Sequence, residues 1–251
     1  LVHIFHMKSK IQNNHTEEKE LVRLNLHMAQ TGVTTRRGAD ELIKKGEVFV
    51  NGKMAVLGQK VSESDEIEIM TYSPKEPHVY FAYNKPVGIV TVNPGSGEKD
   101  ILNTTDFPTK VFPVGRLDKD SHGLIIMTND GRVTSHLLAP EKNHEKEYVV
   151  KTDTDFNEFF LEKLSRGVKF DTYTTKPCVT KQLDSDTFSI ILTEGKNRQI
   201  RRMVSLFRHF VKDLKRVRIE NIKLGPLKEG KFRPIEGKEL DTFLKKINIQ
   251  K

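Results

Sequence analysis

Residues 123–128 constrain the fold of this chain more than any other stretch of its sequence. Their sequence, Gly-Leu-Ile-Ile-Met-Thr, is an almost unbroken apolar run, whereas a strand with one face in water alternates apolar and polar side chains. We therefore predict a strand that is buried on both of its faces. The preceding residues, 115–122, include an arginine, a lysine and two aspartates, so the pattern also places charge at the edge of this predicted sheet.

The chain from residue 79 onward mixes strand and helix patterns, which predicts an α+β fold. The other predicted strands span residues 79–84, 88–92, 147–151, 187–192 and 215–224. The predicted helices span residues 156–166 and 197–210, with a shorter helix that ends near Pro140. About 170 residues of this kind fit the usual size of one domain.

Two short helix patterns mark a smaller module near the start of the chain. They cover residues 21–30 and 36–45 and end at Gly32 and Gly46, because glycine adopts the left-handed conformation at a helix C-terminus most readily. Either threonine of the pair at 34–35 can cap the second helix.

A hairpin pattern follows these helices. Asn51-Gly52 separates two short apolar runs, and both turn residues tolerate the positive φ angles of a tight hairpin. Charged and apolar residues alternate over 66–70, which predicts a further strand, and a stretch with two prolines then indicates a linker. The predicted organisation is a disordered segment over residues 1–20, a small module over 21–72, a linker over 73–78 and a larger domain over 79–251.

The charge of the chain favours a polyanionic partner. Its 251 residues carry 42 lysines and arginines against 34 aspartates and glutamates, a formal net charge of +8. Composition alone leaves RNA, DNA and an anionic membrane surface open. Cations of the small module gather on or next to its helices and in its hairpin, and a solvated helix face is the alternative explanation. These residues are Arg23, Arg36, Arg37, Lys44, Lys45 and Lys53.

Cys178 is the only cysteine, so the chain forms neither an internal disulfide nor a thiolate metal cluster. We interpret it as a half-buried strand residue. No apolar run approaches the roughly 20 residues needed to span a bilayer, so no membrane partner is expected. A chain without disulfides fits a reducing cytoplasm, where we expect the protein. The sequence also lacks metal-ligand spacing and a phosphate-binding glycine loop, so neither a metal nor a cofactor is expected.

The charged loop ahead of the buried strand is the first candidate for chemistry. Residues 115–124 have the sequence Gly-Arg-Leu-Asp-Lys-Asp-Ser-His-Gly-Leu. A carboxylate in such a loop can attack an electrophilic carbon as a nucleophile. The spacing does not choose between Asp118 and Asp120, and a salt-bridged turn without chemistry explains the pattern equally well.

A second candidate lies at the start of the helix predicted over 197–210. One apolar stripe is formed by Ile200, Met203, Val204 and Phe207. Arg198 and Arg202 lie opposite this stripe, facing solvent or phosphate. Arg201 falls on its boundary, where a guanidinium can be partly buried and still keep a carboxylate ionised.

Tyr148 opens the strand predicted at 147–151. Its ring can be a core side chain with a hydrogen-bonded hydroxyl, which is the common situation for a buried tyrosine. Alternatively it stacks on a base or accepts a proton from carbon. The residues alone leave both explanations open.

Two parts of the chain resemble known families. The segments Arg-Leu-Asn at 23–25, Gly-Val-Thr-Thr-Arg-Arg at 32–37 and Val-Phe-Val-Asn-Gly-Lys at 48–53 resemble an S4 RNA-binding domain. Residues 25–27 depart from that pattern, because such domains more often carry an acidic and a basic residue there.

The motifs Gly-Arg-Leu-Asp, Lys-Glu-Tyr and Asn-Arg-Gln-Ile-Arg-Arg-Met follow one another in the order seen in another family. They resemble the pseudouridine synthases that carry an N-terminal S4 domain and modify ribosomal RNA. Within that family they are most similar to the F-type synthases, which act on RNA of the large ribosomal subunit. Asn-Lys-Pro-Val-Gly at 84–88 matches a further landmark of this family.

The resemblance implies a catalytic domain with a mixed, mainly antiparallel sheet, and it assigns roles to single residues. Asp118 matches the catalytic aspartate, Arg201 the arginine that pairs with it, and Tyr148 the active-site tyrosine. Arg116 matches the arginine that helps to displace the target base from the RNA stack, and Asp120 has no such role. The other cations expected to contact RNA are Lys85, Lys119, Arg198, Arg202 and those of the small module.

The implied reaction isomerises one uridine to pseudouridine, the base leaving ribose at N1, rotating and reattaching through C5. The implied substrate is large-subunit ribosomal RNA near the peptidyl-transferase centre, with transfer RNA as a further candidate. We expect a monomer, because no heptad pattern or long apolar edge calls for a partner. The alternatives are a synthase of this family acting on small-subunit RNA, a non-catalytic assembly protein, and an S4-domain methyltransferase. The last would need a glycine-rich nucleotide turn that the sequence lacks.

Overall fold

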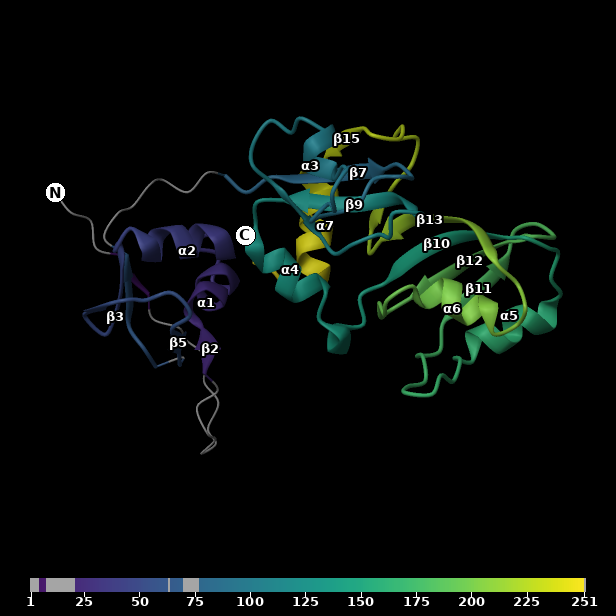
Figure 1. Ribbon diagram of the computed structural model, residues 1–251, viewed down its shortest axis with the longest axis horizontal. Coiled ribbons are helices and arrows are strands. Elements are labelled where there is room, and N and C mark those ends of the chain that lie inside the picture. The colour runs from purple at the N-terminus through teal and green to yellow at the C-terminus, as the bar shows by residue number, and fades with distance from the viewer. Residues whose placement is uncertain (1–4, 8–20, 63, 70–76, 251) are drawn as a thin grey trace. The chain divides into compact units, whose positions relative to one another are not determined.

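The chain forms two compact units, residues 1–78 with 130–132 and residues 79–129 with 133–251 (Figure 1). The computed structural model describes residues 5–7, 21–62, 64–69 and 77–250. Most of the predicted linker at 73–78 lies outside these residues. Within them, no helix has the length and apolar composition needed to cross a membrane.

The first unit contains two short helices and short strands. Its elements are β1 (Phe5–Met7), β2 (Val22–Arg23), α1 (Leu24–Gln30), α2 (Arg36–Lys44), β3 (Val48–Val50), β4 (Lys53–Met54), β5 (Lys60–Val61) and β6 (Ile67–Ile69). The strands pair in the order β1-β6-β3-β4, with β2 and β5 as a separate pair. Buried apolar residues from both helices and from β3, β5 and β6 form one core.

Local sequence signals of this unit are confirmed. The side chain of Thr35 accepts a hydrogen bond from the Gly38 amide and caps α2. Asn51 and Gly52 have φ angles of 52° and 72°, as a tight hairpin between β3 and β4 requires. The first helix begins at Leu24 rather than at residue 21, because Val22 and Arg23 pair with β5.

The expectation of a disordered segment over residues 1–20 is wrong for Phe5–Met7. These residues form β1 and pair antiparallel with β6. An edge strand such as β6 exposes unpaired backbone N–H and C=O groups, and a passing extended segment satisfies them. The other residues of that segment lie outside the described chain.

The second unit is built on a nine-stranded sheet, within the part of the chain that the structure describes. Its strands are β7 (Tyr80–Lys85), β8 (Phe112–Val114), β9 (His122–Thr128), β10 (Lys146–Thr152), β11 (Val179–Gln182), β12 (Thr187–Leu192), β13 (Val211–Ile219), β14 (Ile222–Lys223) and β15 (Phe232–Pro234). The order is β11-β12-β10-β13-β9-β7-β15, with β14 beside β13 and β8 beside β9. Only the pairing of β13 with β9 is parallel among these strands, so the expected mixed, mainly antiparallel sheet is confirmed.

Strand β9 is buried along its whole length, as its apolar run predicts. It pairs with β7 on one side. On the other side it pairs with β13 only at His122 and Gly123, and with β8 only from Ile126 to Thr128. The edge of β9 therefore opens between two partner strands, next to the charged loop.

Two groups of helices pack against different parts of this sheet (Figure 1). The helices are α3 (Ile101–Thr104), α4 (Gly131–Leu137), a 3-10 turn (Pro140–Lys142), α5 (Glu158–Ser165), α6 (Gln199–Ser205) and α7 (Gly237–Lys246). Side chains of α4 and α7 share a core with β7 and β9, whereas those of α5 and α6 share a core with β10, β12 and β13. The other face of β7 and β9 is covered by apolar residues of the loops that lead to the candidate site.

Two predicted elements of this unit differ from the structure. Residues 88–92 form only a single bridge, between Val90 and Asp100, rather than a strand. The helix predicted over 197–210 is limited to Gln199–Ser205, because Arg198 and Arg208 both have positive φ angles. Val211 then begins β13, which pairs with β10.

Candidate active site

The loop that carries Asp118 connects β8 to β9 and is held by buried hydrogen bonds. The Thr91 hydroxyl accepts from the Leu117 amide at 3.0 Å and donates to the Leu117 carbonyl at 2.7 Å. The Gly88 amide donates to the Lys119 carbonyl at 2.9 Å. Because Leu117 is also buried, the neighbouring Asp118 is presented by a fixed backbone.

Lys85 binds the end of the same loop that leads into β9. Its ammonium donates to the carbonyls of Ser121 at 2.8 Å and Pro86 at 2.9 Å, and its side chain is fully buried. Burial lowers the pKa of Lys85 to about 8. The prediction that Lys85 contacts RNA is therefore wrong in this structure, because its charged group is used inside the protein.

Gly123 is required where β9 meets β13. Its φ angle is +105°, and a Cβ there would lie 2.3 Å from the carbonyl oxygen of Arg216. After Gly123, β13 no longer pairs with β9. There the Arg216 side chain satisfies the backbone of β9 instead, because its Nε donates to the Leu124 carbonyl at 2.6 Å. The opening beside β9 thus has a buried guanidinium at its base.

Arg198, the N-cap residue of α6, and Arg201 within α6 both face the Asp118 loop, whereas the helical wheel placed Arg198 toward solvent or phosphate. Arg198 donates to both carboxylate oxygens of Asp120, at 3.1 and 2.8 Å. The Arg201 side chain is only 13% exposed, and its Nε lies 3.3 Å from the Asp120 carboxylate. Arg201 also donates to the Asp120 carbonyl, the Ser121 hydroxyl and the Val211 carbonyl. These contacts confirm its predicted partial burial.

The expected direct pair between Arg201 and Asp118 is not present. The cation that reaches the Asp118 carboxylate is Arg198, at 3.8 Å, whereas both arginines bind Asp120. Since Arg198 hydrogen-bonds the Asp120 carboxylate, the pKa of that group is lowered below its usual value. The two aspartates therefore differ, Asp120 being engaged by two guanidiniums and Asp118 lying at the margin of the same positive charge.

Tyr148 extends from β10 with its ring packed between two of the core clusters. It is half-buried and faces the opening beside β9, together with Asp118. Among the described residues, no hydrogen bond engages its hydroxyl. The expectation that the ring is a core side chain is therefore confirmed, but not the expected hydrogen bond of its hydroxyl, and a role in chemistry stays a prediction.

These residues surround a cleft of about 580 Å³. Its charged lining is Arg116, Asp118, Lys119, Lys146, Glu194, Lys196, Arg198 and Arg216. Arg116 is exposed and has no ion-pair partner within the described chain, whereas Lys119 binds Glu98 at 2.8 Å. Neither Asp120 nor Arg201 belongs to the described residues that line the cleft. Cations thus predominate around the Asp118 carboxylate.

Two cations at the base of the cleft, Lys146 and Arg216, were not predicted from the sequence. Burial, followed by the nearby charge of Arg216, lowers the pKa of Lys146 to about 8. The Nη2 atom of Arg216 is buried and has no hydrogen-bond partner among the described residues. The spacing along each strand could have indicated them, because residues two apart in a strand lie on the same face. Lys146 precedes Tyr148 by two residues, and Arg216 follows the buried Leu214 by two.

The predicted cations of the first unit are all exposed: Arg23, Arg36, Arg37, Lys44 and Lys53. Lys44 forms an ion pair with Glu41 at 2.9 Å. Arg36 and Arg37 open α2, whose first turn holds no acidic residue. Cations at a helix N-terminus oppose its dipole, so their position suits an external anion better than it suits helix stability.

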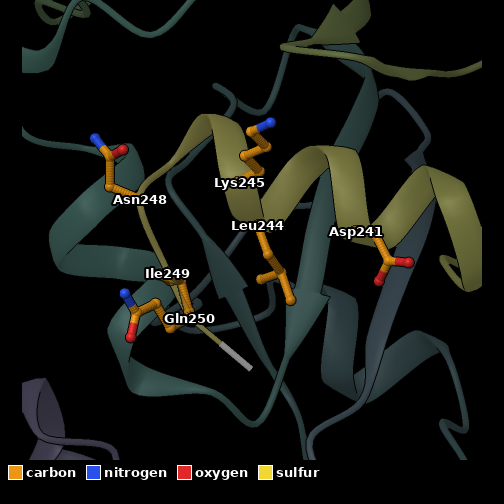
Figure 2. Close-up of a pocket in the computed structure, with 6 residues that line it drawn as sticks. All are labelled: Asp241, Leu244, Lys245, Asn248, Ile249 and Gln250. Atoms are coloured by element: carbon orange, nitrogen blue, oxygen red, sulfur yellow. The ribbon is translucent and has the colours of Figure 1, made fainter.

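Other predicted features can be placed as well. Cys178 is partly buried one residue before β11, and burial raises the pKa of its thiol to about 11, which agrees with an unreactive residue. A second depression lies around the C-terminal part of α7 (Figure 2). It is lined by Asp241, Leu244, Lys245, Asn248, Ile249 and Gln250 and contains none of the predicted site residues. No group of acidic, histidine or cysteine side chains in the described chain is arranged to hold a metal ion.

The fold and the cleft define a class of protein. Residues 79–206 match the family of RNA pseudouridylate synthases, and residues 22–67 match the S4 domain. The chain belongs to the RNA pseudouridine synthase family and carries an S4 domain. It is therefore an isomerase that acts on RNA.

Individual relatives agree with this assignment. The chain is 40% identical over 230 residues to the dual-specificity RNA pseudouridine synthase RluF of Escherichia coli strain K12. The matched region covers 90% of this chain and 79% of that protein. It is 38% identical over 231 residues to the ribosomal large subunit pseudouridine synthase B of Bacillus subtilis strain 168, covering 87% of this chain and 93% of that one. The crystal structure of a pseudouridylate synthase superposes with a TM-score of 0.66 at 28% identity, covering 90% and 99% of the two chains.

Proposed function

We propose that this enzyme converts one uridine of large-subunit ribosomal RNA to pseudouridine, with Asp118 as the catalytic carboxylate. The observation that carries the choice of Asp118 is the unequal use of the two aspartates. Asp120 is bound by Arg198 and Arg201, whereas Asp118 lines the cleft and meets a cation only at 3.8 Å. A nucleophile or base must have its oxygens available to the substrate.

The cations around Asp118 have a chemical role in this proposal. They attract the phosphates of the substrate RNA to the cleft in which the Asp118 carboxylate lies. Asp120 holds Arg198 and Arg201 in place, so it acts as a positioning residue and not as the nucleophile. Asp118 then assists the departure of the base from ribose, either by attacking C6 of uracil or by acting on the ribose.

Tyr148 is proposed to serve the second half of the reaction. After the base has rotated and rejoined ribose through C5, any bond from Asp118 to C6 or to the ribose must have broken again, and a proton must leave C5. The Tyr148 ring lies on the same cleft as Asp118, and no described residue binds its hydroxyl. It supports the base by stacking. Its hydroxyl can relay the proton, accepting it from C5 while giving its own proton to water, or it can orient a water that accepts the proton directly.

Arg116 is proposed to hold the RNA stack open. A uridine must leave its stack to enter a cleft of this kind, which costs a few kcal/mol. Arg116 is exposed on the cleft rim with no ion-pair partner in the described chain, so its planar guanidinium is free to occupy the space that the base vacates. Lys119 and Arg198 on the same rim are suited to the flanking phosphates.

The S4 module, residues 21–72, is proposed to grip RNA outside the cleft, while residues 79–251 perform the isomerisation. The exposed cations of the module support this division, because phosphate contacts add affinity without reading sequence. We propose a monomer, and a cytoplasmic one, since ribosomal RNA is its substrate.

The choice of large-subunit RNA rests on relatives. The B-type synthase is named for the large ribosomal subunit, and RluF is named for dual specificity. A second RNA, such as transfer RNA, is therefore the alternative substrate within the same chemistry.

Pseudouridine mapping tests this proposal. Unmodified large- and small-subunit ribosomal RNA and transfer RNA are each incubated with the enzyme. One new pseudouridine in the large-subunit RNA supports the proposed substrate. Modification confined to small-subunit RNA or to transfer RNA would overturn it.

A further inference from the structure

A pair of aromatic side chains stands beside the cleft on the loop between α5 and β11. The ring centres of Phe170 and Tyr173 lie 5.0 Å apart with an interplanar angle of 36°. Both side chains are only partly buried. The reaction described above uses neither of them.

Arg202 of α6 lies over both rings. Its guanidinium carbon is 4.5 Å from the centre of Phe170 and 5.6 Å from that of Tyr173. Its Nη1 also donates to the Tyr173 hydroxyl at 3.3 Å, in addition to the contacts with the ring faces. No carboxylate pairs with Arg202 within the described chain, and the residue is exposed. One face of the guanidinium is therefore covered by the rings, and the outer side is left to solvent.

Hydrogen bonds and a close backbone contact hold the loop that carries the two rings. The Phe170 amide donates to the Tyr173 carbonyl at 2.8 Å, and the buried Thr175 side chain accepts from the Val168 amide at 2.8 Å. At its base, a Cβ on Gly167 would lie 2.5 Å from the Thr175 carbonyl oxygen, so the two backbones are in contact. The aromatic pair is thus held in place before any ligand arrives.

The same loop is tied to the rim of the cleft. The buried Glu194 carboxylate accepts from the Lys176 amide at 3.0 Å and from the Gln199 side chain at 2.8 Å, and so joins the loop to the start of α6. Lys196 lines the cleft, and its ammonium lies 5.7 Å from the centre of the Tyr173 ring. The stack of rings and guanidinium therefore continues the rim of the cleft that receives the uridine.

We propose that this stack, Phe170 and Tyr173 covered by Arg202, binds an unpaired base of the substrate RNA that flanks the target uridine. Single-stranded bases stack on aromatic rings and on guanidinium planes, and Lys196 is placed for the adjoining phosphate. The inference needs RNA as the substrate, but it does not depend on which uridine is modified. An exposed guanidinium that only binds solvent is the competing explanation.

A charge-matched pair of ligands separates stacking from phosphate attraction. The probes are a single-stranded oligouridylate decamer and an abasic ribose-phosphate chain of the same length. The full-length enzyme is expected to bind the base-bearing strand at least about fivefold more tightly, since stacking of one base contributes that much or more. Arg202→Lys keeps the charge and removes the planar face, and Tyr173→Leu removes one ring, so both should reduce this preference.

Two further variants complete the test. Tyr173→Phe keeps the ring and should keep the preference, and Arg208→Lys changes an exposed arginine without ring contacts in the described chain and should do the same. Equal binding of both probes by the wild type would overturn the inference. Wild-type discrimination in Arg202→Lys would also overturn it, as would a loss in Arg208→Lys. None of these outcomes bears on isomerisation, which is measured by pseudouridine mapping.

Discussion

Arg198 grips the carboxylate of Asp120 through hydrogen bonds of 3.1 and 2.8 Å. The same guanidinium approaches Asp118, two residues earlier, only to 3.8 Å. The sequence alone did not separate these two aspartates, but the structure does, because Arg198 hydrogen-bonds only Asp120. The engaged one organises the positive charge of the site, and the other is left for the substrate.

Arg201 should stabilise the fold as well as the site. Arg201→Ala leaves the Val211 and Asp120 carbonyls and the Ser121 hydroxyl without their donor. We expect a loss of about 1–3 kcal/mol in the free energy of unfolding, measured with urea, together with reduced turnover. Arg208→Ala, which changes an exposed arginine without ion-pair or ring contacts in the described chain, is the control for stability. Equal stability of Arg201→Ala and wild type would show that these bonds are not formed in solution.

The contact between β9 and β13 should tolerate no side chain at Gly123. Gly123→Ala places a methyl group 2.3 Å from the Arg216 carbonyl, and the strands must separate. We expect a loss of about 3 kcal/mol or more in unfolding free energy, or failure to fold. Gly97→Ala is the matched control, since Gly97 has a φ angle of +78° and open space around it. That variant should lose only about 1 kcal/mol. Similar losses in both would contradict the close approach.

The buried Lys146 should make the free energy of unfolding depend on pH in the alkaline range. Burial lowers its pKa from 10.5 to about 8, so between these values the unfolded chain holds a proton that the folded chain has released. Stability therefore rises with pH across this window. Lys146→Met removes this titrating group. The free energy of unfolding of the variant should therefore exceed that of wild type near pH 7, and the difference should disappear towards pH 10. Thermal unfolding across this range, with the exposed Lys151→Met as a control for a lysine lost from the same strand, checks the trend. A gain that does not change with pH would contradict it.

The arginines that open α2 should contribute to RNA affinity through phosphate contacts. The double change Arg36→Gln and Arg37→Gln should weaken binding of ribosomal RNA. It should also reduce the slope of log affinity against log salt by about 1.4, the amount expected for two phosphate contacts to single strands. Lys238→Gln with Lys245→Gln, exposed residues of α7, removes equal charge elsewhere. The same change of slope in both double variants would mean that only net charge matters.

Elements with strong local patterns could be predicted from the sequence. The apolar run of β9 and the Asn51-Gly52 hairpin were placed correctly because their signals are contained in a few neighbouring residues. Strands β8 and β15 were missed, since each is three residues long and contains a proline. Each is part of the sheet because it pairs with a longer strand, β15 with β7 and β8 with β9.

The site could be predicted only in part. The motifs brought Asp118, Tyr148 and the arginines of α6 to one region, and the helical wheel placed Arg201 at a buried boundary. Which carboxylate each arginine binds depends on the path of the loop after β8, and that path is fixed by residues as distant as Thr91. Lys85 was misjudged for the same reason, because burial of a lysine at a strand end is a property of the surrounding fold.

A comparison of Asp118→Asn with Asp120→Asn shows which carboxylate performs the isomerisation. Each substitution neutralises one carboxylate of the same loop and keeps its shape. Pseudouridine formation in unmodified large-subunit ribosomal RNA is followed at saturating enzyme, and RNA affinity is measured alongside. Asp118→Asn is predicted to bind RNA within a few-fold of wild type and to form no pseudouridine, whereas Asp120→Asn retains measurable turnover. Turnover by Asp118→Asn, or a loss of turnover only in Asp120→Asn, would show that Asp118 is not the catalytic carboxylate.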